Sequence, residues 1–320
     1  MAIPGWQRAD SPFHHGERAI QERLGALEQM DTFGRRMIRE FLPEQHRQFY
    51  AQLSYVLVGT IDSAGNPWAS ILVGEPGFIS TPNDSSLHIA AHPLYGDPLT
   101  DILQVGSDIG FLGIELHSRR RNRVNGVVSA IAPDGFDVQV SQTFGNCPKY
   151  IQARQFDLAA FDPTVAKPLH TLTRLGDAER KAIAAADTFF IATAYLDDAA
   201  GAAKGVDVSH RGGNPGFVRI DGNTLTVPDF AGNYHFNTFG NIEVNPRAGL
   251  LFIDFEQGNL LYLTGRAEVI WDGDPEIAAY AGAERLFKFH LTQGIRVDSS
   301  LPLTWSTPEP SRFLAETGPW

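Results

Sequence analysis

The chain has 320 residues, which is more than a single hydrophobic core usually stabilises. Because 43% of these residues are apolar, there are enough to form two cores, so we expect two domains. Its net charge of −11 repels nucleic-acid backbones and anionic lipid surfaces, which excludes both as first choices of partner. Its single cysteine, Cys147, excludes an internal disulfide and a cysteine-based zinc cluster.

Two further features of the sequence bear on location. No apolar run approaches the roughly 18–20 residues needed to span a bilayer. The first residues also lack the basic start and apolar core of a signal peptide. We therefore expect a cytoplasmic protein with no membrane partner.

Residues 1–53 are expected to form a helical lead-in. Apolar residues recur every three or four positions from 16 to 42, which predicts an amphipathic helix with a break near Gly34. A second short helix, Glu44 to Leu53, follows Pro43.

A first β domain is predicted over residues 54–152. Two β-rich runs after Tyr55 are joined by a turn-forming segment, residues 62–67, which predicts a hairpin. Further strands are expected at 87–91, 109–115, 122–131 and 137–142. Short, evenly spaced strands with glycine and proline between them are typical of a closed barrel or a sandwich.

The same pattern returns after a linker and a helix, which we place at residues 153–186. "ASILVGEPGFIST" (69–81) and "VSHRGGNPGFVRI" (208–220) align with an offset of 139, and the same offset relates Gly110 to Gly249 and Gly126 to Gly265. Turn chemistry shared by all such hairpins is the alternative explanation, but it does not require a constant offset. We therefore predict two tandem copies of one barrel, the second over residues 187–320 with a C-terminal helix from Pro275 to His290 and a tail.

The second copy carries the more specific motifs. Its "VSHRGGNPGFVRI", "VPDF", "GN" and "NPRAGLLF" segments, in this order, resemble the flavin-binding split-barrel family of pyridoxamine 5′-phosphate oxidase. The first copy, with "SRRRNRVNG" and "FGNCPKYIQ", resembles longer bacterial relatives. The resemblance implies a mainly β fold with flanking helices, in which two split barrels pack as an intramolecular pseudo-dimer with flavin mononucleotide (FMN) at their junction.

A flavin site needs a clamp for a phosphate dianion, and Ser209, His210, Arg211 and Gly212 suit it, because a guanidinium pairs two phosphate oxygens and glycine lets backbone amides approach. A surface position for Arg211 is the alternative. The first copy has Ile71-Leu72-Val73 at these positions, which cannot pair a dianion, so one flavin per chain is expected.

The resemblance implies further cofactor contacts from both copies. In the second copy these are Pro228, Asp229, Gly232 and Asn233, and we expect His235 and Asn241 to reach the phosphate as well, with a helix-surface position as the alternative for Asn241. His235 and Tyr234 stand where many relatives have a basic residue. From the first copy we expect Arg121, Arg123, Asn125, Asn146 and Cys147, with Arg119, Arg121 and Arg123 projecting to one side of a strand. A solvated arginine edge and a packed thiol are the alternatives.

The function predicted from these residues is an FMN-dependent oxidoreductase that uses NAD(P)H or a partner reductase and acts on a small organic molecule. No catalytic acid or base is identified, and no metal site is expected, because His88 and His92 lack a zinc-protease context. A flavin- or haem-binding carrier or sensor without turnover is the alternative, and a protein-interaction scaffold is a third. The deazaflavin F420 fits the sequence less well as a cofactor, because its anionic polyglutamate tail requires a longer basic groove than one short arginine run provides. A homodimer stays open.

Overall fold

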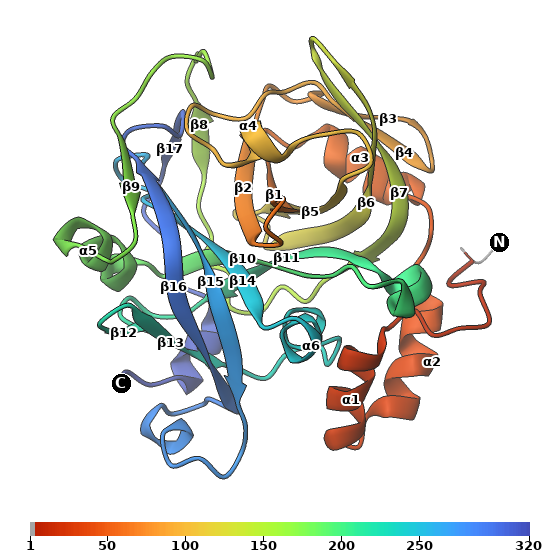
Figure 1. Cartoon of the computed structure of the whole chain (residues 1–320), viewed down its shortest axis with the longest axis vertical. Coiled ribbons are helices and arrows are strands. Elements are labelled where there is room, and N and C mark those ends of the chain that lie inside the picture. The colour runs from red at the N-terminus through yellow and green to blue at the C-terminus, as the bar shows by residue number, and fades with distance from the viewer. Residues whose placement is uncertain (1–3) are drawn as a thin grey trace.

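The computed structural model describes residues 4–320 and begins with three helices (Figure 1). These are α1 (His15–Arg23), α2 (Leu27–Met37) and α3 (Glu44–Ala51). The predicted break near Gly34 is wrong, because the chain turns at Gly25, whose φ is +66°. Gly34 instead lies buried inside α2, where a Cβ would come within 2.4 Å of the Phe13 ring.

The first half of the chain forms one antiparallel sheet. Its strands are β1 (Tyr55–Ile61), β2 (Pro67–Val73), β3 (Ile79–Asn83), β4 (Ser86–Ile89), β5 (Asp108–Glu115), β6 (Arg120–Ala132) and β7 (Gly135–Gly145), with α4 (Leu99–Ile102) between β4 and β5. They are hydrogen-bonded in the order β2-β1-β5-β6-β7-β4-β3.

The second half repeats this order strand for strand. Its strands are β10 (Thr188–Tyr195), β11 (Gly205–Gly212), β12 (Arg219–Asp221), β13 (Thr224–Asp229), β14 (Arg247–Ile253), β15 (Leu260–Ile270) and β16 (Arg285–Val297), with α6 (Asn237–Val244) between β13 and β14. Their order is β11-β10-β14-β15-β16-β13-β12. The fold is mainly β, as predicted, and the shared order supports a tandem duplication.

The remaining elements join or flank these sheets. They are β8 (Phe156–Leu158), which pairs with β17 (Leu303–Trp305), β9 (Leu169–Leu172), which pairs with β16, α5 (Asp177–Ala185), and the short 3₁₀ turns η1 (Asp198–Ala203), η2 (Ile277–Ala279) and η3 (Arg312–Glu316). No helix in the described chain is both long and apolar enough to cross a membrane.

The predicted helix from Pro275 to His290 is wrong. The chain makes only the 3₁₀ turn η2 there and then enters β16, which pairs with β13 on one side and β15 on the other. Leu286, Phe287 and Phe289 are buried in this central strand. Only its first three residues, 285–287, are buried together, so the strand begins with the adjacent apolar residues Leu286 and Phe287, which the sequence pattern alone does not separate from a buried helix.

The offset between the halves is constant over most of the repeat. Ile109 pairs with Gly126 in the first half and Ala248 with Gly265 in the second, so both members of the pair are shifted by 139 residues. Strands β6 and β15 each have a bulge just before this glycine. In the first strand the offset is 133, because Gly59 pairs with Gly110 and Ala192 with Gly249. The difference is a longer β10–β11 connection, which contains η1.

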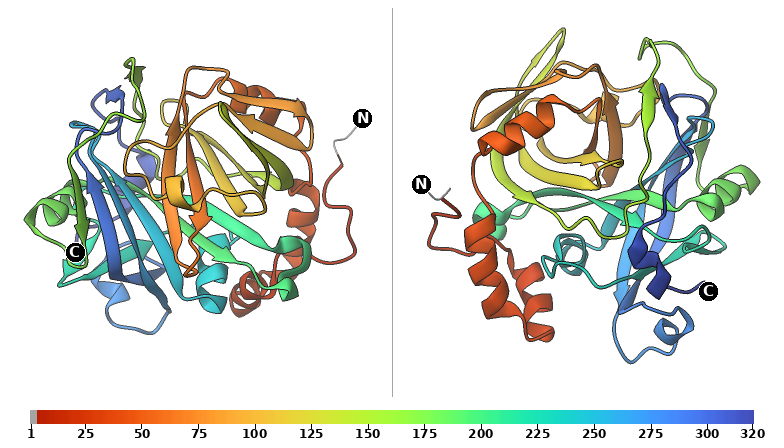
Figure 2. Two further views of the ribbon diagram at one scale, coloured as in Figure 1. Left: turned by 45° about the horizontal axis from the view of Figure 1, so that its top comes forward. Right: turned by 180° about the vertical axis from the view of Figure 1, so that it is seen from behind.

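The two sheets lie side by side and pack through equivalent strands (Figure 2). Strand β5 contacts β11, and β14 contacts β2. A Cβ on Gly110 would lie 2.1 Å from the carbonyl oxygen of Val206, and one on Gly249 would lie 2.3 Å from that of Pro67. Each half has its own apolar core, and a third cluster, including Leu57, Phe190 and Val208, takes residues from both. The halves therefore form one packed unit.

Candidate functional site

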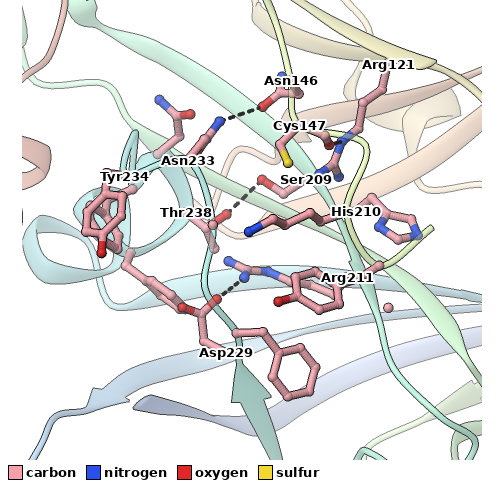
Figure 3. A pocket seen from close by; sticks show the side chains of 18 of the residues that line it. Arg121, Asn146, Cys147, Ser209, His210, Arg211, Asp229, Asn233, Tyr234 and Thr238 are labelled. Carbon is pink, nitrogen blue, oxygen red and sulfur yellow. Dashed lines mark hydrogen bonds and ion pairs between the residues drawn. The ribbon is translucent and has the colours of Figure 1, made fainter. Parts of the chain in front are cut away.

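A pocket of about 120 Å³ lies where the two halves meet (Figure 3). The first half contributes residues of β6 and of the segment after β7, and the second contributes β11, the end of β13, the following loop and the start of α6. The lining residues are Arg121, Arg123, Asn146, Cys147, Lys149, Tyr150, Ser209, His210, Arg211, Gly212, Phe217, Pro228, Asp229, Phe230, Gly232, Asn233, Tyr234, Phe236, Asn237, Thr238, Phe239 and Arg285.

The pocket is strongly cationic although the chain is acidic. Its lining has four arginines and one lysine but a single carboxylate, Asp229. That carboxylate pairs with both Arg211 and Arg285, the latter at 2.9 Å. Lys149 and Arg121 form no ion pair within residues 4–320, and their nearest polar partners are the carbonyl oxygens of Ala231 and Cys147. An anion entering the pocket would therefore find uncompensated positive charge.

Arg121 shows the consequence of this crowding. Its Nε donates to the Cys147 carbonyl oxygen at 2.6 Å, and the rest of the guanidinium has no carboxylate to pair with. Burial, together with the nearby charges of Arg123 and Arg211, lowers the pKa of Arg121 to about 9. A bound anion would reverse this shift, because it favours the charged form.

Several donors in the wall have no hydrogen-bond partner. Within residues 4–320 these are the donors Arg123 Nε, Arg211 Nε and Asn146 Nδ2, and beside them lies the unpaired His210 Nε2, which donates in one neutral tautomer and accepts in the other. Buried polar groups in native proteins are nearly always paired, so a set of unpaired donors around one pocket indicates a missing acceptor. Burial holds the pKa of His210 well below its usual value, so its ring is neutral at pH 7.

A second layer of residues fixes Arg123. Its Nη1 donates to Asn237 at 3.1 Å and pairs with Asp207 at 3.3 Å, and its Nη2 donates to the Ser209 hydroxyl. Asp207 also accepts from Asn125 and Asn241. This network joins β6 to β11 and α6, so the position of Arg123 depends on both halves.

Backbone strain is concentrated at the same place. Five non-glycine residues of the described chain have positive φ, and Tyr150, Tyr234 and Phe236 are three of them, at +62°, +61° and +60°. All three line the pocket. Strained backbone of this kind is common at ligand sites, where surrounding structure must hold it in place.

Most of the predicted site residues come together here, from opposite halves of the chain. Those lining the pocket are Ser209, His210, Arg211, Gly212, Pro228, Asp229, Gly232, Asn233, Arg121, Arg123, Asn146 and Cys147. Position 212 requires a glycine for a steric reason, because a Cβ there would lie 2.1 Å from the Tyr150 carbonyl oxygen.

Three predicted contacts lie elsewhere. The Asn125 side chain donates to Asp207 behind the pocket, and Asn241 is buried between Asp207 and His14, which it meets at 2.8 and 2.9 Å. His235 lines a neighbouring groove. Arg119, expected on the same side as Arg121 and Arg123, precedes β6 and pairs with Glu309, because its φ of +57° turns the chain.

The sequence analysis missed Arg285 and the start of α6. Arg285 was placed inside a helix that does not exist, and only the apolar pairing of β16 with β13 and β15 would have shown that it begins a strand. Asn237 and Thr238 carried no motif. His14, which carries no motif either, caps α1 and contacts Asn241.

The comparisons with known proteins give a family for the second half. Residues 175–313 match the family model described as pyridoxamine 5′-phosphate oxidase. No curated protein matches the chain.

Some solved structures are similar over part of the fold. HupZ of Group A Streptococcus is 18% identical, with 37% of this chain and 89% of that chain covered and a TM-score of 0.29. A FAD-binding protein from Mesorhizobium loti is 15% identical, with 40% and 97% covered and a TM-score of 0.29. MrkH of K. pneumonia, in complex with c-di-GMP, is 10% identical, with 78% and 81% covered and a TM-score of 0.22. The family model for pyridoxamine 5′-phosphate oxidase thus matches the second half of the chain, over residues 175–313.

Proposed function

We propose that the chain is an FMN-dependent oxidoreductase that passes hydride or electrons between NAD(P)H, or a partner reductase, and a small organic substrate. The observation that carries the proposal is the pocket between the halves, where Arg121 and Lys149 have no carboxylate partner within residues 4–320 and three buried donors, Arg123 Nε, Arg211 Nε and Asn146 Nδ2, have no hydrogen-bond partner there. A phosphate monoester supplies the charge and the acceptors that this wall lacks.

The residues present fit FMN. Arg121, Lys149 and Arg211 would hold the phosphate, and the aromatic side chains of Tyr150 and Phe230, whose rings lie 5.0 Å apart, offer apolar surface for the rest of the molecule. Once bound, the flavin supplies reversible uptake of a hydride, so the protein needs no acid or base of its own for that step. The match of residues 175–313 to the pyridoxamine 5′-phosphate oxidase family model supports the same cofactor.

The protein's own part is to bind, orient and shield. The Asp207 network holds Arg123 in place, and Asp229 fixes Arg211 and Arg285 by pairing with both. Such preorganised charges act without rearrangement when the ligand arrives. The proposal includes cytoplasmic location, as expected for an enzyme that uses nicotinamide nucleotides.

The test is a titration of the purified protein with FMN and with riboflavin, which lacks the phosphate, followed by absorbance and flavin fluorescence. We expect one FMN per chain and roughly 100-fold weaker binding of riboflavin, because a buried charge-assisted contact is worth several kcal/mol. Equal affinity for the two flavins, or binding of haem in place of either, would contradict the proposal.

Turnover is tested separately. NADH and NADPH oxidation by the FMN-loaded protein, with oxygen or an artificial acceptor, distinguishes an oxidoreductase from the second candidate, a flavin carrier or sensor. Tight FMN binding without any reduction of the flavin by either nucleotide or by a reductase would favour the carrier.

A further inference from the structure

A second concavity, which we call the side groove, adjoins the pocket. Its volume is about 630 Å³, and it lies between the helices α2 and α3, the start of β6 and the end of β7. Four residues line both spaces, namely Arg121, Asn146, Cys147 and Asn233. A molecule in the side groove would therefore share a wall with whatever fills the pocket.

Part of the side groove is apolar and open. Phe33 of α2 is 38% exposed, although most large apolar side chains of the protein are buried. Met37 and Pro148 line the same groove. A phenylalanine held open at a concave surface favours a ligand with a flat or apolar body.

The charged part of the side groove has one sign. Among the described residues no Asp or Glu lines it, whereas Arg119, Arg120 and Arg121 do. Arg119 is paired with Glu309 at 3.0 Å, and Arg121 is turned to Cys147. Arg120 forms no ion pair within residues 4–320, and its guanidinium lies over the Phe49 ring at 5.0 Å. One guanidinium is thus available to one negative charge.

The wall also holds polar atoms without partners. His235 is 2% exposed and lies among the rings of Phe13, Phe33 and Phe144, and neither of its ring nitrogens has a hydrogen-bond partner. His46 Nδ1 is likewise buried and unpaired. Burial lowers the pKa of both imidazoles to about 4, so both are neutral at pH 7 and each can still donate or accept one hydrogen bond.

We propose that the side groove is the substrate site and that it binds a small organic carboxylate with a flat apolar body, whose charge faces Arg120. This inference rests on the proposed function, since it assigns the substrate of the same flavin enzyme. One available guanidinium balances a monoanionic carboxylate, whereas a phosphate dianion would leave a charge unpaired.

The experiment uses benzoate as the probe, with benzamide as its neutral analogue and phenyl phosphate as the dianion. Binding is measured by calorimetry on the protein with and without FMN, and by the change in flavin absorbance on the FMN-loaded protein. We expect benzoate to bind at least about 10-fold more tightly than benzamide, and Arg120→Met to remove roughly that factor. Arg36→Met is the control, because Arg36 is an exposed arginine of α2 that does not line the groove.

The outcomes separate the two proposals. Benzoate binding that perturbs the flavin spectrum and weakens in Arg120→Met supports the substrate site. If FMN does not bind, but benzoate still binds and Arg120→Met still weakens its binding, the result supports the carboxylate groove and overturns the oxidoreductase proposal. Equal binding of benzamide, tighter binding of phenyl phosphate, or displacement of FMN by benzoate overturns the substrate-site proposal, the last because the groove would then belong to the flavin.

Discussion

The cationic pocket has an equivalent position in the other half of the molecule, and the two have been built differently. Ser209 on β11 corresponds to Ser70 on β2, and Arg123, which reaches Ser209 from the first half, corresponds to Tyr262, which reaches the Ser70 region from the second. Both pairs are 139 residues apart. The same crossing of the halves therefore occurs twice, once with an arginine and once with a tyrosine.

In the first half, the negatively charged group at the equivalent position is a side chain of the protein itself. The Asp97 carboxylate, just before α4, accepts hydrogen bonds from Ser70 Oγ at 2.6 Å, from the Leu99 amide at 2.8 Å and from the Tyr262 hydroxyl at 3.2 Å. The position equivalent to Asp97 before α6 is Phe236, and Arg211 is replaced by the buried Leu72. In the first half Ser70 thus meets a carboxylate of the chain, whereas in the second half Ser209 meets Arg123, and we propose that the cations beside it without a carboxylate partner, Arg121 and Lys149, take an external anion.

The largest expected effect concerns the single acid of the pocket. Asp229→Asn removes the charge that pairs with Arg211 and Arg285, so we expect a loss of about 3 kcal/mol in the free energy of unfolding, because Arg211 loses its carboxylate partner and the buried Arg285 keeps only Glu284. Urea denaturation measures this. Asp221→Asn is the matched control on an exposed aspartate that forms no ion pair with any residue from 4 to 320. A change of under about 1 kcal/mol in Asp229→Asn would show that the charges of Arg211 and Arg285 do not depend on this carboxylate for compensation.

The next effect concerns binding. Arg121→Met should raise the dissociation constant for FMN by roughly 30- to 1,000-fold, because a buried charge contact to phosphate is lost. The unfolding free energy without ligand should not fall, since Arg121 has no carboxylate partner. Leu260, the equivalent residue in the other half, provides the control Leu260→Met. If both variants bind FMN equally well, the two sites do not differ as we describe.

The acid of the first half gives a pH-dependent test. Burial raises the pKa of Asp97 to about 6, against an ordinary value near 3.8. Its contribution to stability is therefore fully present below about pH 4 and is lost as the pH rises through 6. Asp97→Asn keeps the shape and removes the titration, so relative to the natural protein it should gain roughly 1–3 kcal/mol between pH 4 and 7. Urea unfolding at several pH values measures it, and a pH-independent difference would contradict the raised pKa.

The sequence was informative where the repeat is regular. The constant offset gives the hairpins, the strands from β4 to β6 and their equivalents, and the residues of β11 and β13 that line the pocket. It did not give β16, because the adjacent apolar residues Leu286 and Phe287 at its start fit a helix as well as a strand. It also did not give the roles of Asp97, Arg285 and His14, since each acts through contacts with residues 27 to more than 200 positions away. Long-range pairing of this kind has no local sequence pattern.

The smallest expected effect tests the likeness of the halves rather than their difference. Gly110 and Gly249 face the carbonyl oxygens of Val206 and Pro67 across the same contact between the sheets. Gly110→Ala and Gly249→Ala should each cost about 1–3 kcal/mol of unfolding free energy, because the new methyl group forces the two sheets apart. The two losses should agree within about 0.5 kcal/mol if the contact is equivalent in both halves. A variant that lowers stability at one glycine only would mean that the halves share a strand order but not a packing, and the correspondence between Asp97 and the ligand anion would then lose its geometric basis.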